Sequence, residues 1–86
     1  MNFKSTYIST TTTTTVKSGR GRLHTITVGT TSAGAITVYD NTAGSGTIIA
    51  VLKASVAEQT FTFDCEFATG LTIVTAGNSL ITVTYL

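Results

Sequence analysis

The stretch QTFTFDCEF (residues 59–67) decides the fold class, because apolar and polar side chains alternate along it. Successive side chains of an extended strand point to opposite faces of a sheet. One face of this stretch is therefore apolar and carries Phe61, Phe63, Cys65 and Phe67. A single apolar face is typical of an antiparallel sheet that covers a core on one side. We expect these side chains to lie in the core, with Cys65 as a buried thiol of low reactivity.

Segments with the composition of β-strands recur on both sides of this stretch. They are AITVYD (35–40), GTIIAVLKA (46–54), LTIVTA (71–76) and LITVTYL (80–86). Turn sequences rich in glycine and asparagine separate strands about every 10–12 residues, which predicts an all-β fold. GTIIAVLKA is apolar on both faces, which fits a central strand or a strand that faces a subunit. We expect a small antiparallel β-sandwich or barrel of about six to seven strands.

The segment RLHTITV (22–28) departs from regular alternation. Leu23 lies on one parity, whereas Ile26 and Val28 lie on the other. A β-bulge near His24–Thr25 would bring all three side chains to the same face, because a bulge adds one residue to one strand. The alternative is that Leu23 faces a neighbouring molecule rather than the core.

The N-terminal segment contains six consecutive threonines followed by basic residues. Threonine favours extended structure, but it suits either face of a sheet, so such a strand needs a partner to fix its register. We expect residues 1–17 to form an extended arm or edge strand and residues 18–86 to form a single β-sandwich domain. The residues expected to contact a partner are Tyr7, Thr10, Thr11, Thr12, Thr13, Thr14, Thr15, Lys17, Arg20 and Arg22.

The composition indicates a protein that associates with itself or with a larger assembly. Charged residues make up 10% of the 86 residues and the net charge is +1, compared with about 25% charged residues in ordinary domains. Small domains gain stability from disulfides, metals or oligomerisation. One cysteine cannot form a disulfide within the chain, and one histidine with one cysteine is too few for a metal site. Oligomerisation is therefore the remaining source of stability. The polar N-terminus and the absence of an apolar run of about 18–20 residues predict neither a signal peptide nor a membrane span.

The charges are also ordered along the chain. Four of the five basic residues precede residue 40, whereas all four acidic residues lie at or after it. This order permits head-to-tail complementarity between copies. Chance among so few charges is the alternative explanation.

No catalytic, metal or phosphate motif is present in the sequence. His24 is most simply a strand histidine, and Asp64 and Glu66 share one face without a second ligand-bearing loop. SGRGR (18–22) lacks the phosphate-loop pattern, and its basic residues are not interleaved with aromatic residues as in nucleic-acid sites. We expect no enzymatic activity, no cofactor, no metal and no nucleic-acid partner.

Several segments together resemble small β-rich virion structural proteins of tailed bacteriophages. They are GRLHTITV, AITVYDNTAGSGT, FATGLTIVTAG and ITVTYL, which cover most of residues 17–86. The resemblance implies a capsid decoration (cement) protein that acts as a homotrimer. Such a protein would be made in the host cytoplasm and would bridge major capsid protein subunits on the outside of the virion. The alternatives are a tail, neck or head-fibre component, or a glycan-binding adhesin module.

Overall fold

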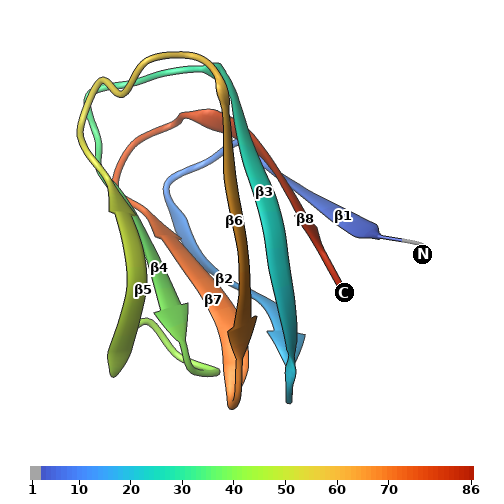
Figure 1. Ribbon diagram of the computed structural model, residues 1–86. Coiled ribbons are helices and arrows are strands. Elements are labelled where there is room, and N and C mark those ends of the chain that lie inside the picture. Colours follow the sequence, from blue (N-terminus) through green and yellow to red (C-terminus); the bar gives the residue numbers. More distant parts are fainter. Residues whose placement is uncertain (1–2) are drawn as a thin grey trace.

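The computed structural model describes residues 3–86, which contain eight β-strands and no helix (Figure 1). The prediction of an all-β antiparallel fold is confirmed, although eight strands replace the expected six or seven. The extra strands arise because the N-terminal segment forms two strands instead of one. The strands are β1 (Lys4–Ile8), β2 (Thr12–Ser18), β3 (Gly21–Thr30), β4 (Ile36–Asp40), β5 (Thr47–Leu52), β6 (Thr60–Phe67), β7 (Gly70–Thr75) and β8 (Leu80–Tyr85).

The strands form two four-stranded sheets. Sheet A has the order β1-β8-β3-β6 and sheet B has the order β2-β7-β4-β5. Neighbouring strands are antiparallel throughout both sheets. This interleaved order, in which the chain passes repeatedly between the two sheets, is that of a jelly roll. β1 and β2 occupy one edge of each sheet, and β6 and β5 occupy the opposite edges.

The threonine-rich segment belongs to the sandwich itself. β1 pairs with β8, and β2 pairs with β7 of the same chain. The boundary expected at residue 17 falls inside β2, whereas β1 and β2 are both edge strands, one of the two forms expected for residues 1–17. The physical reason is that the neighbouring strand β7 supplies the partner that fixes the register of the threonines.

The core lies between the inner faces of the two sheets. Its apolar side chains include Leu23, Ile26, Val38, Ile73 and Ile81, all of which are completely buried. β6 lies at the edge of sheet A, so its apolar face is only half-buried at Phe61, Phe63 and Cys65. Phe67, the last residue of β6, is 1% exposed. Alternation in β6 is therefore confirmed, but full burial is reached only where the chain turns into β7.

The β-bulge expected near His24–Thr25 is confirmed. Leu23 pairs with Tyr85 and Thr25 pairs with Thr84, so His24 is the additional residue opposite β8. Leu23 and Ile26 are both 0% exposed despite their opposite parity. The alternative, in which Leu23 faces a neighbouring molecule, is therefore wrong.

Candidate protein-interaction site

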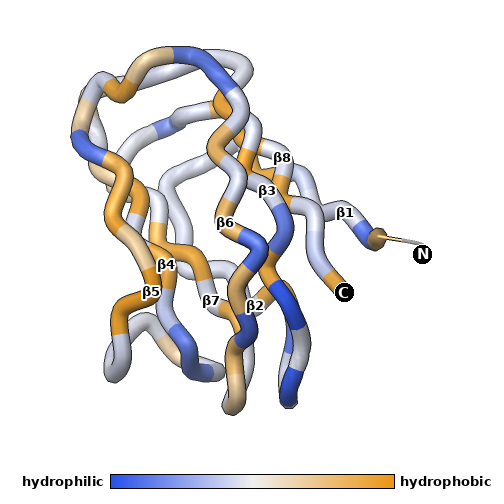
Figure 2. The backbone as a smooth tube through the Cα atoms, viewed as in Figure 1, coloured by the Kyte–Doolittle hydropathy of each residue, from blue (hydrophilic) through white to orange (hydrophobic). Residues whose placement is uncertain are grey.

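The outer face of sheet B carries exposed apolar side chains on its edge strand, β5. Ile48 and Val51 are 54% and 56% exposed, and we call this pair the β5 patch. Val51 lies opposite Thr37 of β4, and Ile48 lies opposite Tyr39. Figure 2 shows the apolar colour continuing along most of β5. Exposed apolar surface of this kind marks a contact site when it forms a cluster.

The remainder of this outer face is covered by the loop between β4 and β5. Thr72 donates a hydrogen bond from Oγ1 to the carbonyl oxygen of Asn41 at 2.8 Å. Thr15 donates from Oγ1 to the carbonyl oxygen of Thr42 at 3.2 Å. A Cβ atom at Gly44 would lie 2.9 Å from Cγ2 of Val74, so the loop packs closely on β7. The loop thereby covers β7, reaches Thr15 of β2 and leaves the β5 side of sheet B open.

β5 also differs in charge from the other edge strands of the described chain. Natural proteins protect edge strands from association with charged residues, and lysine is common in this role. β1 carries Lys4, β2 carries Lys17, and β6 carries Asp64 and Glu66. β5, with the sequence TIIAVL, carries no charge. The feature that limits association at the other three edges is therefore missing from β5.

Two further exposed apolar side chains lie at the edge of sheet A. Phe3 and Tyr7 are 41% and 62% exposed, and we call this pair the β1 patch. The ring of Phe3 stacks on the imidazole of His24, with 4.0 Å between centroids. Nδ1 of His24 in turn lies 2.5 Å from Oδ1 of Asp64 on β6. These contacts run across the outer face of sheet A and hold the start of β1 against it.

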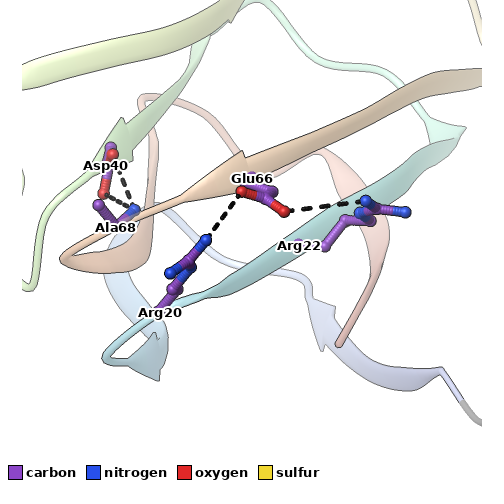
Figure 3. Close-up of polar contacts among 5 residues, drawn as sticks. All are labelled: Arg20, Arg22, Asp40, Glu66 and Ala68. Atoms are coloured by element: carbon purple, nitrogen blue, oxygen red, sulfur yellow. Dashed lines mark hydrogen bonds and ion pairs between the residues drawn. The ribbon is translucent and has the colours of Figure 1, made fainter.

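One end of the sandwich brings together the charged side chains of Arg20, Arg22, Asp40 and Glu66 (Figure 3). Arg20 and Arg22 both approach Glu66, at 3.4 and 3.9 Å. These ion pairs are exposed, and surface pairs contribute only about 0–1 kcal/mol each. A cavity of about 460 Å³ lies at this end of the sandwich. It is lined by Arg20, Asp40, Glu66, Phe67 and Ala68.

Asp40 has a structural role at this end. Its carboxylate accepts hydrogen bonds from the backbone N–H groups of Ala68, Thr69 and Gly70. The N–H groups of Thr69 and Ala68 lower the pKa of Asp40, because they stabilise its charged form. Asp40 thus attaches the end of β4 to the turn between β6 and β7.

The residues predicted to contact a partner do not form one site. Tyr7 is exposed at one edge of the molecule, whereas Arg20 and Arg22 lie at the end where they pair with Glu66. The threonines of 10–15 alternate in exposure along β2, and several of their polar atoms bond within the chain. Their contact with a partner stays a prediction. The β5 patch was not predicted as a site, although the two apolar faces of its strand were the signal that could have identified it.

The remaining reactive side chains are dispersed. Burial raises the pKa of the Cys65 thiol, which lowers the fraction of reactive thiolate at neutral pH. Within residues 3–86, no group of three potential ligands lies close enough together to hold a metal ion. The same residues contain no helix that is long and apolar enough to cross a membrane.

Comparison with known proteins identifies a related fold. No family model and no curated protein matches this sequence. Among solved structures, the chain is similar to the core of Drosophila NLP, with a TM-score of 0.58 and 17% sequence identity. The match covers 100% of this chain and 97% of that chain. The NLP-core structure concerns pentamer formation and histone binding, and at this identity the likeness shows the fold alone.

This comparison contradicts the function expected from the sequence resemblance. The expectation was a phage capsid decoration protein that acts as a trimer on the major capsid protein. The similar structure is instead that of a protein that forms pentamers and binds histones. The expected function, capsid partner and trimer are therefore wrong. The physical reason is that GRLHTITV, ITVTYL and the YDNTAGSG turn are strand and turn sequences, which specify a fold rather than a function.

Proposed function

We propose that the chain is a non-catalytic, self-assembling protein module whose β5 patch is a subunit interface. The observation that carries the proposal is the uncharged edge strand β5, which exposes Ile48 and Val51. Full burial of one aliphatic side chain contributes about 1.5–3 kcal/mol. An interface over this patch would therefore remove from water the largest aliphatic side chains that the described chain leaves exposed.

Composition supports the same proposal. A chain with 10% charged residues and a net charge of +1 has little electrostatic repulsion to oppose association. The likeness to the NLP core adds that this fold is compatible with a pentamer. We therefore propose a closed oligomer, with the pentamer as the form to test.

The test is the oligomeric state of charge variants. Val51→Lys places a charge in the centre of the proposed contact and removes at least about 1.4 kcal/mol of favourable burial, which corresponds to a tenfold weaker association. Ala33→Lys is the matched control, because Ala33 is exposed in the loop between β3 and β4 and belongs to neither apolar patch. Light scattering after size exclusion should show an oligomer for the wild type and Ala33→Lys, and a folded monomer for Val51→Lys. An unchanged oligomer in Val51→Lys would refute the assignment of the interface.

Histone binding is a second candidate, supported by the full-length likeness to the NLP core. Histones are basic, so the groups that would meet them are acidic. The acidic side chains on the surface of sheet A are Asp64 and Glu66 of β6. Asp64 lies beside His24, and Glu66 lies beside Arg20 and Arg22. Calorimetry with purified core histones tests this function. Binding that weakens in Asp64→Asn and Glu66→Gln would support it, and no heat of binding at low ionic strength would refute it.

A further inference from the structure

We infer that the subunit contact is head to tail, with the β5 patch of one copy seated on the β1 patch of the next. This inference rests on the proposed self-assembly and assigns the second surface that the contact requires. Among residues 3–86, the large apolar side chains that remain exposed are Phe3 and Tyr7 of the β1 patch and Ile48 and Val51 of the β5 patch. Both patches are apolar, and apart from the stacking of Phe3 on His24 no contact within the chain covers them.

The two patches lie on opposite sides of the molecule. β1 is an edge strand of sheet A, and β5 is the edge strand on the other side of sheet B (Figure 1). A contact between different surfaces of two copies leaves the β1 patch free on one copy and the β5 patch free on the other, so further copies can add. The assembly closes into a ring if the rotation between neighbours closes, and it grows as a filament if it does not. A contact of the β5 patch with itself would stop at a dimer. A head-to-tail contact is therefore the type that a ring with an odd number of subunits requires.

The charges on the edge strands are complementary in the same direction. The link between β1 and β2 spans only residues 9–11, which keeps these two edges on the same side. This side carries Lys4 and Lys17 and no acidic residue in either strand. Edge strands β5 and β6 carry Asp64 and Glu66 and no basic residue. Asp64 and Glu66 already lie beside His24, Arg20 and Arg22 of their own chain, so this charge difference adds little to a contact that the apolar patches carry.

The β1 patch is also held in a fixed position. β1 pairs with β8 over its whole length without a register shift, and Phe3 stacks on His24. A surface that is already ordered loses less conformational entropy when it binds.

The available surface is sufficient for two such contacts. The chain exposes 4362 Å², and a specific interface buries about 800 Å² on each partner. Each copy in a ring makes two contacts, which would cover more than a third of its surface. Coverage on this scale accounts for the scarcity of charged residues.

Cross-linking of single-cysteine chains tests the direction of the contact. In a Cys65→Ala background, Tyr7→Cys is made in one chain and Val51→Cys in another, and a short bismaleimide is added to each chain alone and to their mixture. The head-to-tail contact predicts linked dimers only in the mixture. A chain with both substitutions should give a ladder of linked species that ends at the size of the ring. Ala33→Cys mixed with Val51→Cys is the control and should stay unlinked.

The outcomes separate this inference from the proposed function. Linked dimers of Val51→Cys with itself would show self-association through β5 patches facing each other, which overturns the head-to-tail contact alone. An oligomer in which Tyr7→Cys and Val51→Cys do not link would also overturn it. A monomer by light scattering, with no linked product in any mixture, would overturn the proposed function as well.

Discussion

The burial gradient along β6 predicts very different costs for two substitutions of the same kind. Phe67 is 1% exposed and closes the end of the core, where a Cβ atom at Gly21 would lie 2.7 Å from its ring. Phe67→Ala should therefore cost about 3–5 kcal/mol, the range for a fully buried phenylalanine. Phe63 is only half-buried at the sheet edge, so Phe63→Ala should cost clearly less.

The larger cost is close to the whole stability of a domain of this size. At about 0.05–0.15 kcal/mol per residue, 86 residues give about 4–13 kcal/mol. Because 1 kcal/mol corresponds to about 4–8 °C in a domain of this length, Phe67→Ala should lower the melting temperature by about 12–40 °C. Phe67→Leu, which keeps most of the buried volume, should cost about 1–2 kcal/mol and provides a measurable variant if Phe67→Ala does not fold.

The assay is thermal and urea unfolding followed by circular dichroism. All variants are compared at one protein concentration, because association raises the apparent stability with concentration. Equal losses in Phe67→Ala and Phe63→Ala, or a larger loss in Phe63→Ala, would refute the burial gradient and the position of β6 at the sheet edge.

Two further predictions concern the polar contacts of Thr75 and Asp40. Oγ1 of Thr75 donates to the carbonyl oxygen of Thr10 at 2.6 Å and accepts from the N–H of Thr12 at 3.0 Å. Thr75→Val should therefore lower the free energy of unfolding by about 1–3 kcal/mol. Thr13 lies on the exposed face of β2, so the control Thr13→Val should change this free energy by less than about 0.5 kcal/mol. Urea unfolding measures both changes. The hydrogen bonds that lower the pKa of Asp40 also stabilise the fold. This stabilisation is complete at pH values above the ordinary pKa of 3.8, and it is lost as the pH falls from there through the folded-state pKa. The difference in melting temperature between wild type and Asp40→Asn should be constant from pH 7 to about 5 and narrow below about 4, and a difference that widens on acidification would contradict this.

Much of the fold could be predicted from the sequence because period-two alternation reports burial directly. The apolar face of β6 and the bulge at His24 are examples, since both follow from the parity of the apolar side chains. The position of a strand in its sheet has no such signal. The threonines of β2 lack a preferred face, so their pairing with β7 depends on residues more than 50 positions away.

The candidate site was harder to predict for the same reason. The sequence shows that both faces of β5 are apolar, which suits a buried central strand as well as an exposed edge. Only the strand order places β5 at the edge of sheet B and exposes Ile48 and Val51. Arg20 and Arg22 illustrate the opposite case, because exposed basic residues suggested a partner and the structure pairs them with Glu66.

Native mass spectrometry of the wild-type chain at micromolar concentration tests the central claim most directly. Self-assembly through the β5 patch predicts a discrete species of several chains of 8.9 kDa, five if the assembly follows that of the similar NLP core. The same measurement on Val51→Lys should show the mass of one folded chain. A wild-type spectrum that contains only the monomer across the accessible concentrations would contradict the account.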